Sequence, residues 1–139
     1  MTIDLLPTIS HLIGAKLPKH RIDGKNIWPL ISGDEKAKSP QEAYFFYYGN
    51  QLQAVRSGKW KLHFPHGYRT MAGRPGGKGG IPTNYSQAKI GLSLFDLEND
   101  VGETTELKEK HPEVAQRLID LGKAFDADLK TTKRTPGRL

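Results

Sequence analysis

The sequence "AYFFYYGNQLQAVRSGKWKLHF", residues 43–64, decides the fold of this chain. Aromatic residues dominate its first part, and apolar and polar residues alternate in the two stretches that follow, which is typical of half-buried β-strands. Two residue pairs suited to tight hairpin turns, Gly49-Asn50 and Ser57-Gly58, separate the three stretches. The pattern predicts three antiparallel strands connected one after the other.

Two segments further along the chain complete the predicted domain. The sequence "IGLSLFDL", residues 90–97, predicts a fourth strand. A helix is expected to begin at Pro112, because proline fits the first helical turn. The apolar stripe of this helix consists of Val114, Leu118, Leu121 and Phe125. We therefore predict the α+β class, with a four-stranded antiparallel sheet and a C-terminal helix packed on it.

The segment between the third and fourth predicted strands, residues 65–89, is expected to be a long loop. It contains six glycines and three prolines, and loops of this length inside compact domains are usually functional or mobile. Its glycines do not form a nucleotide P-loop, because Ala72 replaces the first glycine and Gly79 follows Lys78 where Ser or Thr is needed. A looser anion site built from backbone N–H groups stays open.

The N-terminal segment predicts a separate helix. Its apolar residues recur at helical spacing, and Asp4 and Gly14 stand at the positions expected for the N-cap and the C-cap. These apolar residues are Leu5, Leu6, Ile9, Leu12 and Ile13. A helix of about ten residues with a trailing loop cannot bury its own apolar face. We expect this face to pack against another domain or to mediate self-association, with a domain boundary that separates residues 1–40 from residues 41–139.

Charge is distributed unevenly along the 139 residues, whose net charge is +6. No Asp or Glu occurs from Ala43 to Phe95, a stretch that holds seven basic residues, whereas five acids crowd into residues 96–106. This separation predicts a face or loop for an anion, and a solvated basic surface is the plainer alternative. A stand-alone module that binds sulfated glycan or nucleic acid is one function consistent with it. No apolar run approaches the length of a membrane span, so we expect no membrane partner.

No metal site or catalytic group emerges from the residue pattern. The sequence "DLENDVG", residues 96–102, resembles the start of a calcium loop, but Gly102 comes one position late and Leu107 replaces the bidentate Glu. We interpret these acids as turn formers. His63 and His66 could share a metal, although an exposed strand histidine and a loop histidine are the preferred interpretation. The chain contains no cysteine.

Five segments occur in the order found at the C-terminal end of the sulfatase family. They are "IDLLPTISHLIGAKLP", "RIDGKNIWPLISG", "AVRSGKWKLHF", "LFDLENDVGETTEL" and "HPEVAQRL". Together they resemble the arylsulfatase A type, which depends on formylglycine. The resemblance implies a large α/β catalytic domain, to whose end residues 1–40 would belong, followed by a C-terminal domain formed by residues 41–139. It also implies calcium and formylglycine in the full-length parent, a sulfate-ester substrate, and export from the cytoplasm.

The chemistry of this family requires a C/S-x-P-x-R motif, whose first residue becomes formylglycine. No serine here fits the motif, since Ser39 is directly followed by Pro40. No catalytic, cofactor-binding or metal-binding residue is therefore expected within these residues, and we predict that the chain alone is inactive. The resemblance implies that it completes the fold and lines the substrate cleft. The resemblance places His66, Tyr68 and Arg69 at the rim of the cleft, whereas Lys59 and Lys61 are expected to face solvent.

Overall fold

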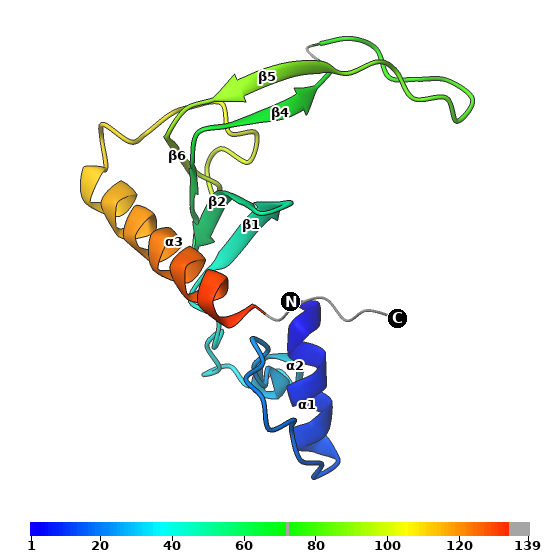
Figure 1. Ribbon diagram of the computed structural model, residues 1–139, viewed down its shortest axis with the longest axis vertical. Coiled ribbons are helices and arrows are strands. Elements are labelled where there is room, and N and C mark those ends of the chain that lie inside the picture. The colour runs from blue at the N-terminus through cyan, green and yellow to red at the C-terminus, as the bar shows by residue number, and fades with distance from the viewer. Residues whose placement is uncertain (72, 134–139) are drawn as a thin grey trace. The chain divides into compact units, whose positions relative to one another are not determined.

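The computed structural model describes residues 1–71 and 73–133, which fall into two compact units (Figure 1). The N-terminal unit comprises Met1–Glu42 and the C-terminal unit comprises Ala43–Leu139. Among the described residues, no helix combines the length and the apolar character needed to span a bilayer. Each unit is considered separately below.

The C-terminal unit is built on a four-stranded antiparallel sheet with the strand order β1-β2-β3-β6. Its strands are β1 (Tyr44–Tyr48), β2 (Gln51–Ser57), β3 (Trp60–His63) and β6 (Ser93–Asp96). The turn at Gly49-Asn50 is confirmed, and the φ of +58° at Gly49 suits a hairpin turn with glycine at its first central position. The second turn lies at Gly58-Lys59, one residue later than predicted, because Ser57 still pairs with Trp60.

Helix α3 (Pro112–Thr132) packs on this sheet and confirms the α+β prediction. The buried apolar core joins the helix and three strands through Val55, Leu62, Leu94, Ala115 and Leu118. Phe125, on the edge of the helix stripe, stacks on Phe45 with 3.8 Å between ring centroids. The helix packs tightly at Gly122, where an added Cβ would lie 2.8 Å from the Phe64 ring and 2.9 Å from the Val55 side chain.

The predicted long loop contains two strands, which corrects the expectation for residues 65–89. Strand β4 (His66–Thr70) pairs antiparallel with β5 (Ser86–Ile90), and together they form a two-stranded ribbon separate from the main sheet (Figure 1). Ile90 therefore belongs to this ribbon, and the fourth strand of the sheet begins only at Ser93. Neither ribbon strand carries a strong apolar alternation, because the ribbon buries neither face and is joined through backbone hydrogen bonds.

The N-terminal unit consists of a 3-10 turn (Thr2–Asp4), α1 (Leu5–Leu12) and the short α2 (Trp28–Ile31). Asp4 precedes α1 as predicted, but its carboxylate makes no capping bond. Instead the buried carboxylate accepts hydrogen bonds from Lys25 N at 2.8 Å and from Gln41 Nε2 at 2.7 Å. These hydrogen bonds to Asp4 hold the segment that follows α1 against the start of the helix.

Helix α1 buries polar side chains and exposes apolar ones, which is the reverse of the usual arrangement. Its buried residues include Thr8 and Ser10, and the Thr8 hydroxyl accepts a hydrogen bond from Ile27 N at 3.0 Å. Its apolar side chains stay open to solvent, with Leu6 52 % and Ile13 72 % exposed. Leu5, Ile9 and Leu12 are similarly exposed. The predicted unpartnered apolar face is therefore present in the structure.

Candidate functional site

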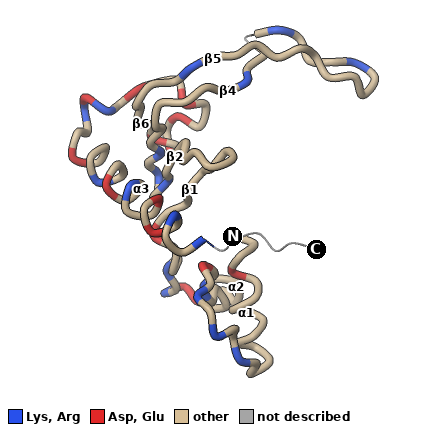
Figure 2. The backbone as a smooth tube through the Cα atoms, viewed as in Figure 1, with Lys and Arg blue, Asp and Glu red and all other residues tan. Residues whose placement is uncertain are grey.

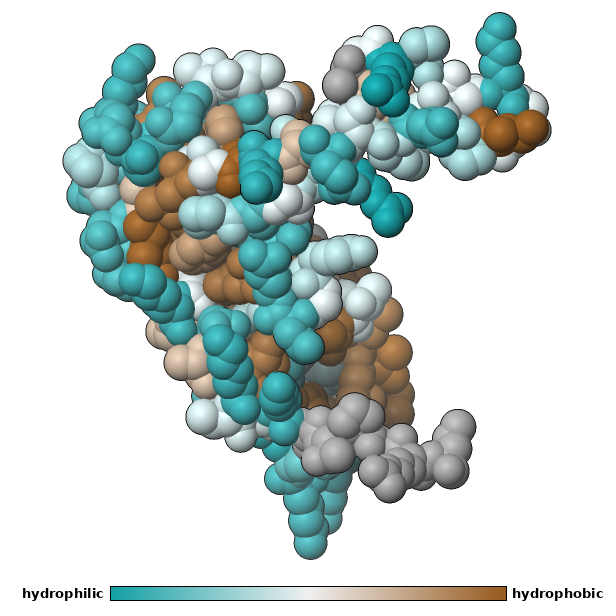
Figure 3. Space-filling model, turned by 45° about the horizontal axis from the view of Figure 1, so that its top comes forward, coloured by the Kyte–Doolittle hydropathy of each residue, from teal (hydrophilic) through white to brown (hydrophobic). Residues whose placement is uncertain are grey.

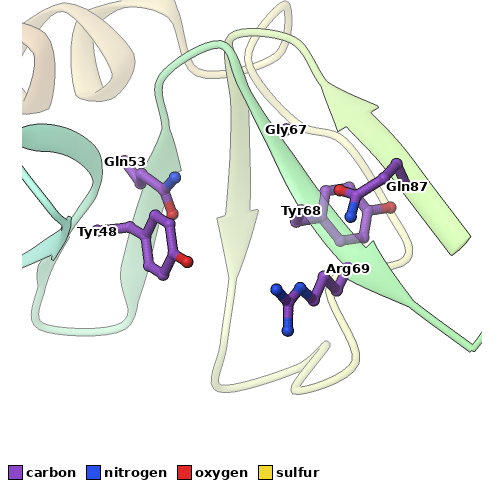
Figure 4. A pocket seen from close by; sticks show the side chains of 6 residues that line it. All are labelled: Tyr48, Gln53, Gly67, Tyr68, Arg69 and Gln87. Atoms are coloured by element: carbon purple, nitrogen blue, oxygen red, sulfur yellow. The ribbon is translucent and has the colours of Figure 1, made fainter. Parts of the chain in front are cut away.

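A cavity of about 390 Å³ opens between the β1–β2 hairpin and the β4–β5 ribbon of the C-terminal unit (Figure 4). Its walls are formed by Tyr48, Gln53, Gly67, Tyr68, Arg69 and Gln87. Figure 4 shows Tyr48 and Gln53 on one side and the ribbon side chains on the other, with Arg69 extending toward the Tyr48 side. The ribbon that the sequence did not predict therefore supplies one whole wall of this pocket.

A β-bulge shapes the wall formed by the hairpin. The pairing of β1 with β2 runs in regular register from Tyr44 to Phe46 and then shifts, so that Tyr47 pairs with Leu52. Gln53 is the extra residue that this shift leaves between the two registers. Bulges bend a strand and redirect a side chain, and they are common beside functional sites. The bulge accounts for the presence of Gln53 in the pocket.

The opposite wall depends on the cross-strand register of the ribbon. Arg69 pairs directly with Gln87, so these two side chains lie on the same face, next to each other. Gly67, two residues before Arg69, shares that face and adds no side chain. The wall is thus polar and cationic, and no carboxylate from any described residue lines the pocket.

The predicted rim residues divide into two groups. Tyr68 and Arg69 both line the pocket. His66 does not, because its ring stacks on His63 with 5.5 Å between centroids and its Nδ1 lies 2.7 Å from the carbonyl oxygen of Phe64. Tyr48, Gln53 and Gln87 were not predicted, since only the bulge and the strand pairing bring them beside the rim residues.

The acids that follow the sheet neutralise the basic face of β3. Lys59 Nζ lies 2.8 Å from an Asp96 oxygen, and Lys61 Nζ lies 2.5 Å from a Glu103 oxygen. The side chain of Lys61 is only 16 % exposed, so the expectation that it faces solvent is wrong. Sequence alone could not reveal this pairing, because Lys61 and Glu103 are 42 residues apart. These acids act as ion-pair partners as well as turn formers.

The cations of the ribbon remain available for an anion. Among the described residues, no carboxylate forms an ion pair with Arg69, Arg74, Lys78 or Lys89. Figure 2 shows Lys and Arg but no Asp or Glu along β4, β5 and the loop that joins them. Figure 3 shows mainly hydrophilic side chains along this ribbon and a hollow beneath it. The ribbon thus presents basic side chains without a described acidic partner.

Glu103 also contacts a half-buried histidine behind the ribbon. Its carboxylate lies 2.6 Å from His63 Nε2, and the φ of Glu103 is +53°, which L-residues rarely adopt. Burial opposes ionisation of Glu103, but the hydrogen bond and charge of Lys61, followed by His63, lower its pKa overall. Burial lowers the pKa of His63, against the opposing effect of Glu103. His63 is thus neutral and donates from Nε2, and its buried Nδ1 has no described partner.

We expect the stability of the C-terminal unit to fall as the pH drops below about 6.5, the ordinary pKa of histidine. Below this pH, His63 is protonated in the unfolded chain but still neutral in the folded chain, because burial lowers the pKa of His63 in the folded state. The loss is at most about 1.4 kcal/mol per pH unit for one proton. Chemical denaturation between pH 7.5 and 5 measures it, and His63→Phe should flatten the slope.

His20→Asn is the control for this measurement, because His20 is exposed in the N-terminal unit. This variant should keep the slope of the unsubstituted chain. An unchanged slope in His63→Phe would contradict the assignment of the pH dependence to His63.

Comparison with known proteins identifies this C-terminal unit. Residues 39–139 match the family model described as the C-terminal region of aryl-sulfatase. The chain belongs to the sulfatase family. The resemblance that the five sequence segments indicate is therefore confirmed, and it concerns the C-terminal region.

Curated sulfatases align with nearly the whole chain. Arylsulfatase A of Bos taurus is 35 % identical over 130 residues, which cover 90 % of this chain and 25 % of the relative. Steryl-sulfatase of Mus musculus is 34 % identical over 146 residues, which cover 92 % and 23 % respectively. The chain thus spans about a quarter of the length of the curated sulfatases it matches.

Solved sulfatase structures share the fold. A sulfatase from Pseudoalteromonas sp. superimposes with a TM-score of 0.70 and 17 % identity, over 96 % of this chain and 26 % of that structure. At this level of identity the match supports the fold alone.

The calcium of the sulfatase family finds no suitable ligand set in the described residues. No group of three or more His, Asp or Glu side chains is arranged there to hold a metal ion. His63 and His66, the pair considered from sequence, stack on each other, and His63 directs its Nε2 at Glu103. No step of the sulfatase reaction is assigned to this chain through a metal.

Proposed function

We propose that this chain is the C-terminal part of a sulfuric ester hydrolase and that it lines the substrate cleft without hydrolysing the ester itself. The observation that carries the proposal is the pocket that Tyr68 and Arg69, neighbours on β4, both line and that no carboxylate of a described residue lines. Sulfate esters are anionic, so a cationic rim without carboxylates attracts and orients them. Tyr68 and Arg69 are assigned to substrate contact, and His66 to positioning the base of the ribbon.

The partner of the chain is the catalytic domain of a sulfatase. Residues 1–40 would belong to the end of that domain, and residues 41–139 would form the C-terminal domain. The exposed apolar face of α1 supports this role, because a helix that buries Thr8 and Ser10 and exposes its leucines needs an apolar surface to cover it. A large α/β domain offers such a surface, whereas self-association through α1 is the alternative for the isolated chain.

The alternative of a stand-alone module for sulfated glycan or nucleic acid is not favoured. The family match covers residues 39–139, and the relatives are sulfatases of about four times this length. Pairing of Lys59 and Lys61 with acids also removes two cations that such a module would use.

The isolated chain should not hydrolyse 4-nitrophenyl sulfate, even when calcium is added. The reason is chemical: the 139 residues contain no cysteine and no serine in the C/S-x-P-x-R motif, so none can become the aldehyde nucleophile. Release of 4-nitrophenolate by the purified chain measures this directly. Hydrolysis that persists after a second, orthogonal purification would contradict the proposal.

A further inference from the structure

The two-stranded ribbon is attached to the main sheet through two short links. Phe64-Pro65 separates β3 from β4, and Gly91-Leu92 separates β5 from β6. The ribbon forms a sheet of its own, and no other described strand pairs with it (Figure 1). The direction in which the ribbon leaves the main sheet is therefore set near these links, and this direction also decides the shape of the pocket.

Three ring side chains follow one another across the first of these links. The ring of His63, on β3, stacks on the ring of His66 with 5.5 Å between centroids and an interplanar angle of 21°. The His66 ring in turn meets the ring of Tyr68 edge to face, with 6.4 Å between centroids. Both separations lie in the range of favourable ring contacts. Because Tyr68 lines the pocket, this row of rings runs from the main sheet to the pocket wall.

Glu103 holds the end of the row that lies on the main sheet. One oxygen of its carboxylate lies 2.5 Å from Lys61 Nζ, and the other lies 2.6 Å from His63 Nε2. Lys61 and His63 are two residues apart on β3, so their side chains leave the same face of the strand. The Nδ1 atom of His63 is buried and has no hydrogen-bond partner among the described residues. The orientation of the His63 ring thus depends on the hydrogen bond to Glu103.

The backbone conformation of Glu103 also points to a specific need for its side chain. Its φ of +53° is the one positive φ of a non-glycine residue within residues 1–71 and 73–133. Glycine and asparagine adopt this conformation more readily than glutamate does. Unfavourable backbone conformations of this kind cluster at functional sites, where the surrounding structure maintains them. A glutamate at this position indicates that its carboxylate is required.

We infer that Glu103 is a positioning residue for the pocket, although it does not line the pocket itself. By holding the His63 ring it fixes the ring of His66, and with it the direction in which the ribbon leaves the main sheet. Arg69, the cation of the pocket wall, is carried by that ribbon. The consequence for the parent enzyme rests on the proposed role of the ribbon as the rim of the cleft. There, a misplacement of about 1 Å can cost roughly a hundredfold in rate.

Residual dipolar couplings of the backbone amides test the inference on the weakly aligned 139-residue chain. They report the direction of each N–H bond in a common frame, and we expect one frame to fit the main sheet and the ribbon in the unsubstituted chain. Glu103→Ala removes both contacts of the carboxylate. The couplings of β4 and β5 should then shrink, whereas those of β2 and β3 should keep their values. The ring nitrogen signals of His63 should no longer show a single tautomer protonated at Nε2.

Two further variants separate positioning from stability. Glu103→Gln keeps an oxygen that accepts from His63 Nε2 but loses the charge that pairs with Lys61, so it should retain the His63 tautomer and the ribbon couplings. His66→Leu interrupts the row on the ribbon side, and it should shrink the ribbon couplings without changing the His63 tautomer. Glu98→Ala is the matched control and should change neither, because Glu98 belongs to the same acidic segment but is 68 % exposed.

The outcomes distinguish this inference from the proposed function. Ribbon couplings that still fit the frame of the main sheet in Glu103→Ala overturn the inference, as do ribbon couplings that are already averaged in the unsubstituted chain. If Glu103→Ala does not fold, unchanged ribbon couplings in His66→Leu overturn it. The rim function is tested separately by titration with phenyl sulfate. Absence of binding, or an affinity that Arg69→Gln leaves unchanged, contradicts the rim function and leaves the positioning role of Glu103 standing.

Discussion

Replacing Leu118 by alanine should lower the free energy of unfolding of the C-terminal unit by about 2–5 kcal/mol. Leu118 is fully buried, and it joins α3 to Val55, Leu62 and Leu94 of the sheet in a single core cluster. The substitution removes apolar packing and leaves a cavity between two layers that cannot collapse fully. Urea denaturation followed by circular dichroism measures the change.

Lys123→Ala is the matched control for the core substitution, because Lys123 lies at an exposed position of the same helix. It should change the free energy of unfolding by no more than about 0.5 kcal/mol. A Leu118→Ala variant as stable as the control would mean that α3 does not pack on the sheet as described. Loss of the sheet would also open the pocket, since β1 and β2 form one of its walls.

Replacing Gly24 by alanine should destabilise the N-terminal unit by about 3 kcal/mol or more, since each buried polar group left without its hydrogen bond costs about 1–3 kcal/mol. An added Cβ would lie 1.9 Å from the carbonyl oxygen of Ile3, a distance that no backbone tolerates without moving. The displaced loop would break the hydrogen bonds from Lys25 N to Asp4 and from Ile27 N to Thr8. Hydrogen exchange of the Lys25 and Ile27 amides measures this change directly.

Gly91→Ala provides the same chemical change at a position without neighbours. No heavy atom lies within 4 Å of a Cβ added at Gly91, and its φ is not in the left-handed region. This variant should keep the amide protection of the N-terminal unit. Protection of the Lys25 and Ile27 amides that survives Gly24→Ala would show that the loop does not contact the helix as described.

The sheet and its helix were predictable because their pattern is local. Strand residues alternate in period two and the α3 stripe recurs at helical spacing, so the sequence places Leu118 on the packed face of the helix, where the structure buries it. The apolar face of α1 was predictable for the same reason. Its polar face was not, because the partners of Asp4 lie at Lys25 and Gln41, far along the chain.

The candidate site was only partly predictable. His66, Tyr68 and Arg69 could be proposed because the resemblance to sulfatases implies a role for the loop after the third strand, and the absence of acids there agrees with it; of the three, Tyr68 and Arg69 line the pocket. Gln53 and Gln87 could not be proposed. Gln53 enters the pocket through a register shift and Gln87 through cross-strand pairing, and neither feature can be recognised from residue types. The ribbon itself was missed because its strands, of which neither face is fully buried, lack the strong apolar alternation that makes strands recognisable.

By itself the sequence determined the four-stranded sheet, the packed helix, the family and the lack of a formylglycine residue, because all of these depend on residue identity and short-range spacing. Only the tertiary structure decided which charges remain available. Lys61 and Glu103, 42 residues apart, neutralise each other, whereas the cations of the ribbon meet no described carboxylate. Electrostatic energy depends on the distance between charges in space, and that distance is set by the fold.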